Sequence, residues 1–135
     1  MSAQSFKSGQ SLSPLALGEM TKETIAEYSR VSKDPNPMHV DEELAKAAGY
    51  PTVYAQGMLG MAYLARHLTG VCGVGKLKRI KVRFKTLTWP GEQITCRARV
   101  TEINKQGKSD WVTCEIQTEN ESGEPKVIGT ATFEA

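Results

Sequence analysis

The sequence predicts an α+β fold in which a group of helices precedes an antiparallel sheet. Helix-type spacing of apolar residues is confined to residues 21–68, whereas apolar and polar residues alternate with a period of two from residue 79 onward. Four alternating segments follow one another with short polar turns between them, and this order predicts a meander. Because the last helix is apolar on nearly every side, we expect the sheet to wrap around it.

The first two predicted helices have recognisable ends. One runs from Thr21, a residue type that caps helix N-termini, to Ser32, because two prolines shortly downstream disfavour further helical angles. The other runs from Asp41 to Ala48 and stops at Gly49, a glycine in the position typical of helix C-termini. The connection between these two helices carries both prolines.

The third predicted helix and the strands are expected to form the core. The helix covers residues 56–68 and ends before Gly70, and its nearly all-round apolar character is typical of a buried helix. One strand is expected before the helices, at residues 10–17. The four strands of the meander are expected at residues 79–86, 94–101, 111–118 and 127–133.

Length and composition are those of one ordinary globular domain, residues 1–135. The chain is 39% hydrophobic and 24% charged, without a low-complexity tract. Its net charge of +2 lacks the basic excess of nucleic-acid-binding domains, so we expect no nucleic-acid partner. Three widely spaced cysteines fit neither a disulfide framework nor a zinc site, which predicts reduced thiols and a cytoplasmic location.

No segment of the sequence has the composition of a membrane-directed element. The opening Met1–Gln10 lacks the apolar core of a signal peptide. The longest apolar-rich stretch, residues 58–68, is too short to span a bilayer and contains two basic side-chain types. We therefore expect a soluble protein without a membrane partner.

The segment Asp34–His39 places a carboxylate, the amide of Asn36 and an imidazole within six residues. Prolines follow both Asp34 and Asn36 and restrict their backbone to extended angles, so polar groups can be held at fixed positions. Hydration of an α,β-unsaturated thioester needs a base for water, an acid for the α-carbon and donors for the thioester oxygen. A carboxylate and an imidazole around one water supply the first two, and the amide of Gly57 at a helix start supplies the third.

Spacing alone does not separate such a site from a simple connection. Asp-Pro-Asn-Pro is also a common turn composition, and a single histidine is more often a structural residue than a catalyst. On spacing alone, a connecting turn is therefore the simpler interpretation of residues 34–39.

Several motifs of the chain resemble those of one known family. The run at residues 28–41 contains Asp-Pro-Asn-Pro-Met-His and is similar to the signature of the MaoC-like, (R)-specific enoyl-CoA hydratases. The similarity continues through Ala-Gln-Gly-Met-Leu at 55–59, Val-Arg-Phe-Lys at 82–85 and Trp-Pro-Gly-Glu-Gln-Ile at 89–94. It covers essentially the whole chain, including the opening residues 1–10.

This resemblance implies a hotdog fold, in which an antiparallel sheet wraps a long helix and two subunits pair to build the sites. It implies that Asp34 and His39 are catalytic, that Asn36 is a structural or water-positioning partner, and that the amide of Gly57 belongs to an oxyanion hole. Gln56 stands where the family usually has histidine. Glutamine donates and accepts hydrogen bonds but carries no proton at neutral pH, so we expect Gln56 to position substrate rather than to transfer protons.

The expected activity is the reversible hydration of trans-2-enoyl-CoA to (3R)-3-hydroxyacyl-CoA by a homodimer. We expect coenzyme A or acyl carrier protein as the carrier of the substrate, and no metal or other cofactor. The alternatives are a (3R)-hydroxyacyl-acyl-carrier-protein dehydratase, a hotdog thioesterase, and a non-catalytic hotdog subunit that stabilises a partner or binds acyl-CoA. The presence of both Asp34 and His39 argues against the non-catalytic subunit.

Two further features have more than one interpretation. Basic residues alternate with apolar ones along residues 79–85, where they could bind the phosphates of coenzyme A, contact an acidic carrier protein, or protect a sheet edge from pairing. His67 lies near the end of the third predicted helix, and we expect its charge to interact with the last helix carbonyls.

Overall fold

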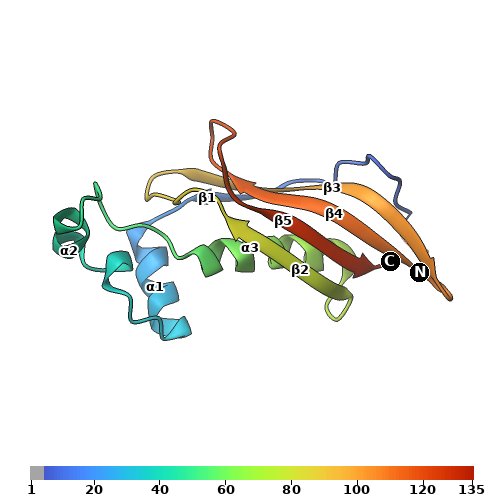
Figure 1. Ribbon diagram of the computed structural model, residues 1–135, viewed down its shortest axis with the longest axis horizontal. Coiled ribbons are helices and arrows are strands. Elements are labelled where there is room, and N and C mark those ends of the chain that lie inside the picture. Colours follow the sequence, from blue (N-terminus) through green and yellow to red (C-terminus); the bar gives the residue numbers. More distant parts are fainter. Residues whose placement is uncertain (1–4) are drawn as a thin grey trace.

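The computed structural model describes residues 5–135, and its main features are an antiparallel sheet and a long helix against one face of that sheet (Figure 1). The prediction that residues 1–10 form no signal peptide concerns in part residues 1–4, which lie outside the described residues. In the described part, the sheet has five strands in the order β1-β3-β4-β5-β2. The strands are β1 (Leu15–Glu19), β2 (Leu77–Phe84), β3 (Gln93–Gln106), β4 (Ser109–Glu119) and β5 (Pro125–Glu134).

The two short helices, α1 (Lys22–Ser32) and α2 (Glu42–Ala47), lie together beyond one end of the sheet (Figure 1). The Thr21 side chain accepts a hydrogen bond from a first-turn amide of α1, and the Asp41 side chain does the same for α2. Both predicted helices are thus confirmed. Lys33 ends α1 in the left-handed conformation, with φ 58°, and turns the chain toward residues 34–39.

The long helix α3 (Gly57–Cys72) continues further than the sequence predicts. Gly70 lies inside it, and the helix ends at Cys72, where Gly73 caps it with a φ of 98°. A glycine in a helix interior costs only about 1 kcal/mol relative to alanine, which burial of the helix against the sheet offsets. Leu64 and Leu68 of α3 are both 0% exposed.

The sheet departs from the predicted four-strand meander at one edge. Strands β3, β4 and β5 are consecutive neighbours, but β2 pairs with β5, so Lys81 is opposite Thr130 and Val82 is opposite Gly129. Alternation in the sequence reports which face a side chain takes and not which strand is its neighbour. The first strand is also displaced: β1 spans 15–19 rather than 10–17, and residue 11 forms only an isolated bridge.

The core lies between α3 and the sheet. Its fully buried side chains come from both layers, including Leu64, Leu68, Val100, Val112 and Phe133. Burial of this kind stabilises a fold by about 25 cal/mol for each Å² of apolar surface removed from water. No helix within residues 5–135 is long and apolar enough to cross a membrane.

Two side chains of the core bear on predictions from the sequence. Cys96 and Cys114 are free thiols and 0% exposed, in agreement with the interpretation that they fill strand positions. The prediction for His67 is wrong, because α3 continues beyond it and its side chain is buried. Its Nε2 atom lies 2.7 Å from the carbonyl oxygen of Ser13, so the ring contacts the segment before β1 and not the helix end.

Candidate active site

The loop after α1 is organised by hydrogen bonds between its own residues. The amide of Asp34 donates to the carbonyl of Ser29 over 3.1 Å. The Asp34 carboxylate accepts from the amide of Asn36 at 3.0 Å, and the Asn36 side chain accepts from the amide of Met38 at 3.1 Å. Such turns order a proline-containing segment locally. Asn36 therefore builds the loop that carries Asp34 and leads into the short 3₁₀ helix η1 (Pro37–His39).

His39 is held in one orientation by the main chain. Its side chain is only 6% exposed, and its Nδ1 atom lies 2.7 Å from the carbonyl oxygen of Tyr54. Because a carbonyl can only accept, Nδ1 carries a hydrogen, and in the neutral ring the lone pair is on Nε2. The Nε2 atom is 3.8 Å from Oδ2 of Asp34, whose side chain is 33% exposed. This separation exceeds a direct hydrogen bond and suits a water between the two groups.

Gly57 is the first residue of α3, where backbone amides have no partners within the helix. The preceding Gln56 makes no side-chain cap to these amides. A methyl group at Gly57 would lie 2.9 Å from the ring of Phe84. Any residue other than glycine at position 57 would therefore be too close to the ring in its present position. The amides at this end, together with the positive end of the helix dipole, can stabilise a developing negative charge.

Gln56 connects the start of α3 to α1. Its side chain is 4% exposed, and its Nε2 atom donates to the carbonyl of Ile25 at 2.9 Å and to the hydroxyl of Ser29 at 2.7 Å. The carbonyl of Ser29 accepts the amide of Asp34. One short chain of contacts therefore links the acid-bearing loop to the residue before Gly57.

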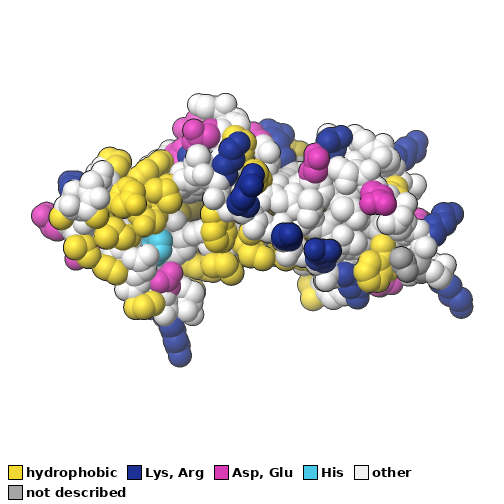
Figure 2. Space-filling view, in the orientation of Figure 1, with side chains coloured by type: hydrophobic (Ala, Val, Ile, Leu, Met, Phe, Trp, Pro, Cys, Tyr) yellow, Lys and Arg dark blue, Asp and Glu magenta, His cyan; other side chains and the backbone are white. Residues whose placement is uncertain are grey.

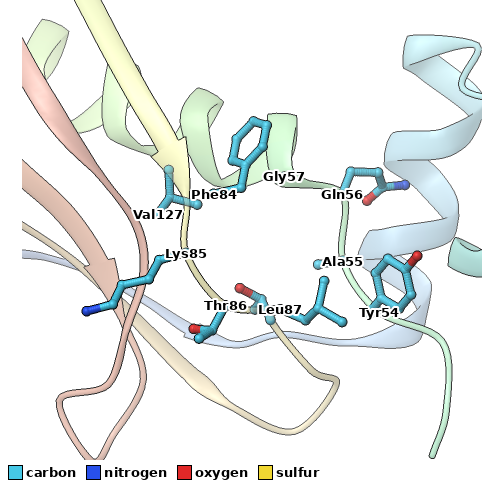
Figure 3. A pocket seen from close by; sticks show the side chains of 10 residues that line it. Tyr54, Ala55, Gln56, Gly57, Phe84, Lys85, Thr86, Leu87 and Val127 are labelled. Carbon is cyan, nitrogen blue, oxygen red and sulfur yellow. The ribbon is translucent and has the colours of Figure 1, made fainter. Parts of the chain in front are cut away.

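A cavity of about 230 Å³ opens beside the start of α3 (Figure 3). Gln56 and Gly57 line it, whereas Asp34, Asn36 and His39 do not. The connection between the two groups is Tyr54, which lines the cavity and whose carbonyl accepts a hydrogen bond from the ring of His39. The other lining residues are Ala55, Phe84, Lys85, Thr86, Leu87, Thr88 and Val127.

The segment between β2 and β3 forms one wall of this cavity and is fixed by a buried lysine. Lys126 is 1% exposed, and its ammonium group lies 2.9 Å from both the carbonyl of Leu87 and a carboxylate oxygen of Glu92. Burial lowers the pKa of Lys126, but the carboxylates of Glu124 and Glu92 outweigh burial and raise it above its ordinary value. Burial also raises the pKa of Glu92, but hydrogen bonds from a side-chain amide, a backbone amide and the ammonium keep it below its ordinary value.

Two contributors to the site have no signal in the sequence. Tyr54 acts through its backbone carbonyl, which every residue type possesses. Lys126 alternates within a strand like a solvent-facing residue, and only the fold reveals that it is buried between Leu87 and Glu92. The proximity of Phe84 to Gly57 likewise follows from the position of β2 beside α3.

A sheet wrapped on one long helix, with an acid and an imidazole near the start of that helix, defines a hotdog-fold protein of the hydratase and dehydratase class. The chain belongs to the MaoC-like family: the family profile for a MaoC like domain matches residues 6–122. An R-hydratase structure from Pseudomonas aeruginosa superposes with a TM-score of 0.84 and 24% identity, covering 96% of this chain and 82% of that one. This likeness confirms the predicted fold.

Two curated relatives are much longer proteins than this chain. A peroxisomal multifunctional enzyme type 2 of Mus musculus is 32% identical over 94 residues, which are 67% of this chain and 12% of that protein. A peroxisomal enoyl-CoA hydratase 2 of Arabidopsis thaliana is 33% identical over 92 residues, which are 66% of this chain and 28% of that protein. The chain therefore spans only a small part of the length of these relatives.

Proposed function

We propose that this chain catalyses the reversible hydration of trans-2-enoyl-CoA to (3R)-3-hydroxyacyl-CoA. The observation that supports this most directly is the arrangement of Asp34 and His39. The His39 ring has its Nδ1 hydrogen bound to a carbonyl, and its free Nε2 lone pair faces a carboxylate oxygen 3.8 Å away. A water between the two groups would be oriented and ready to lose a proton.

In the proposed reaction the oxygen of this water forms a bond to the β-carbon of the enoyl thioester. One of its protons passes to the Asp34–His39 pair, and the π electrons move toward the thioester oxygen. The amide of Gly57 stabilises the resulting enolate charge. The pair then provides a proton to the α-carbon, which restores the thioester and leaves a 3-hydroxyl group. No metal or redox cofactor takes part in this scheme.

The carrier of the acyl group would extend over the basic residues at the end of β2 and directly after it. Lys81, Arg83 and Lys85 are exposed, and none of them forms an ion pair with any residue from 5 to 135. Lys85 also lines the cavity, so these cations continue from its opening. They suit the phosphates of coenzyme A. The same charges suit an acidic carrier protein, and a (3R)-hydroxyacyl-acyl-carrier-protein dehydratase is therefore the second candidate.

We further propose that the chain acts as a homodimer. Figure 2 shows hydrophobic side chains gathered over the end of the molecule that contains α1 and α2. Val31 of α1 is 58% exposed, and Val40, shortly before α2, is 54% exposed. Met58 and Phe84, beside the cavity, are each 54% exposed as well. Large apolar side chains exposed close to one another are typical of an interface between proteins. The cytoplasmic location stays a prediction that rests on the free thiols.

The test is loss of the enoyl absorbance of crotonyl-CoA on addition of the purified chain. Asp34→Asn and His39→Ala are compared with Asp110→Asn, a matched change of an exposed carboxylate on β4. We expect hydration by the wild type and by Asp110→Asn, and at least a hundredfold loss in the other two variants. A wild type that is inactive on enoyl thioesters of both coenzyme A and carrier protein would overturn the proposal and favour a non-catalytic subunit.

A further inference from the structure

The ion pair of Lys126 and Glu92 holds the cavity wall at two points. The ammonium group of Lys126 donates to the carbonyl of Leu87 at 2.9 Å, and the carboxylate of Glu92 accepts from the amide of Trp89 at 2.7 Å. A buried ion pair is often no more stabilising than apolar side chains of the same size, because the loss of hydration offsets the attraction. Its charge-assisted hydrogen bonds are, however, short and directional, so the groups that it binds have fixed positions.

The first connection from this ion pair to His39 runs through the main chain. Leu87, whose carbonyl the ammonium binds, is followed by Thr88, and the carbonyl of Thr88 accepts a hydrogen bond from the amide of Ala55 at 2.9 Å. The residue before Ala55 is Tyr54. Its carbonyl is the group that accepts the hydrogen bond from Nδ1 of His39 at 2.7 Å.

The second connection runs through aromatic rings. The ring of Trp89 meets the ring of Tyr54 at 82°, with 6.1 Å between the ring centroids. The ring of Tyr54 meets the imidazole of His39 at 88°, with 5.2 Å between the centroids. Edge-to-face contacts of this kind are a preferred packing of aromatic side chains. Tyr54 therefore contacts His39 twice, with its carbonyl and with its ring, and each contact is connected to the ion pair.

We propose that the Lys126–Glu92 ion pair is a positioning element of the reaction, which holds Tyr54 and thereby directs Nε2 of His39 at Asp34. This inference rests on the proposed hydration. Neither charged residue lines the cavity, so both act through Tyr54 and not on the substrate. Without this support the imidazole could turn, and Nε2 would no longer reach the water that it shares with Asp34. A misplacement of about 1 Å is enough to slow a reaction strongly.

The test replaces both charges at once, because Lys126→Met alone would leave a partly buried carboxylate without its cation. In Lys126→Met/Glu92→Leu we expect a folded protein whose kcat for hydration of crotonyl-CoA is about tenfold lower, while KM changes little. The matched control is Arg99→Met/Glu115→Leu. It removes an ion pair of 2.8 Å between two exposed side chains of the sheet and should leave kcat unchanged.

The orientation of His39 can be followed separately by NMR. The chain contains two histidines, and each has one ring nitrogen bound to a backbone carbonyl, so labelling histidine with nitrogen-15 reports on both rings. In the Lys126→Met/Glu92→Leu variant, the bound ring N–H signal of His39 should shift or broaden. The signal of His67 should not, because its partner Ser13 belongs to neither connection.

A purely structural role of the ion pair would lower stability and leave the His39 signal of the folded protein unchanged, and that result overturns the inference. A changed signal with wild-type kcat overturns it as well. If the double variant does not fold, Glu92→Gln takes its place, since glutamine has the shape of glutamate but only one oxygen for the two contacts. An unaltered His39 signal there has the same meaning. A wild type that hydrates no enoyl thioester overturns the proposed function instead, and the ring signals, which need no substrate, still show whether the ion pair holds His39.

Discussion

The Nε2 atom of His39 lies 3.8 Å from Oδ2 of Asp34, a separation that one shared water would bridge. If both groups act on the same water, either substitution removes the function of the pair. We therefore expect the double variant Asp34→Asn/His39→Ala to lose about as much turnover as the more damaging single variant. The measurement is the turnover number with crotonyl-CoA. Losses that multiply in the double variant would instead show that the two residues act independently.

Much of the fold could be predicted from local patterns. The helix caps Thr21 and Asp41 act through contacts within one turn, so their residue types are sufficient to locate the helix starts. The end of α3 could not be located in this way, because burial against the sheet extends the helix through Gly70. The pairing of β2 with β5 depends on contacts distant in sequence, and periodicity carries no information about them.

Of the candidate site, the sequence could predict the catalytic side chains but not the main-chain groups that hold them or the cavity beside them. The carboxylate of Asp34 and the ring of His39 have a recognisable order along the chain, and the structure places them near each other. The groups that fix them have no residue-type signal, since the carbonyls of Ser29 and Tyr54 are main-chain atoms. The sequence also cannot show that a cavity borders Gln56 and Gly57 but not Asp34 and His39.

Gly57 should not tolerate even one added carbon. The methyl group of Gly57→Ala would lie 2.9 Å from the ring of Phe84 and would displace either the ring or the helix start. Because a small shift of the oxyanion donor is costly, we expect hydration to fall about ten- to a hundredfold. Gly70→Ala is the matched control, since its methyl group meets nothing within 4 Å and should leave activity unchanged while adding about 0.5–1 kcal/mol of stability. Equal activity of both variants would contradict this role of Gly57.

Lys126 should contribute strongly to stability. Lys126→Met leaves the carboxylate of Glu92 partly buried without its cation, which we expect to cost about 3 kcal/mol in the free energy of unfolding at neutral pH. Denaturant unfolding measures this cost, with exposed Lys105→Met as the control. If Lys126→Met lowers the free energy of unfolding no more than Lys105→Met does, the ion pair does not stabilise the cavity wall.

The same pair should make this cost depend on pH. The pKa of Glu92 is lowered by folding, so its contribution is present above the ordinary value of 4.5 and is lost as pH falls through the folded pKa. The pKa of Lys126 is raised, so its contribution is present below the ordinary value of 10.5 and is lost as pH rises through the folded pKa. We expect the difference between wild type and Lys126→Met to be constant between these limits and to shrink outside them.

The three thiols should differ in reactivity. Burial raises the pKa of Cys96 to about 12 and that of Cys114 to about 11, and both side chains are inaccessible. Burial also raises the pKa of Cys72, but this residue is only half-buried at the end of α3. Because the thiolate is the reactive form, we expect an aromatic disulfide reagent at mildly alkaline pH to label Cys72 alone, and all three after unfolding. Rapid labelling of a second thiol in the native protein would contradict the packing described for β3 and β4.

The basic residues at the end of β2 and directly after it should affect binding of the carrier and not the chemistry. Lys85→Ala and Arg83→Ala remove charges at the opening of the cavity, so we expect KM for crotonyl-CoA to rise about three- to tenfold for each, with an unchanged turnover number. Crotonyl N-acetylcysteamine has the same thioester but no phosphate, and its kinetics should be the same in all variants. Lys108→Ala is the control, because Lys108 is an exposed lysine in the turn between β3 and β4.

Added salt should raise KM for the CoA substrate in the wild type and less so in the variants, since mobile ions screen the attraction. If the variants bind the phosphate-free substrate as poorly as the CoA substrate, the charges shape the cavity itself and do not bind the carrier.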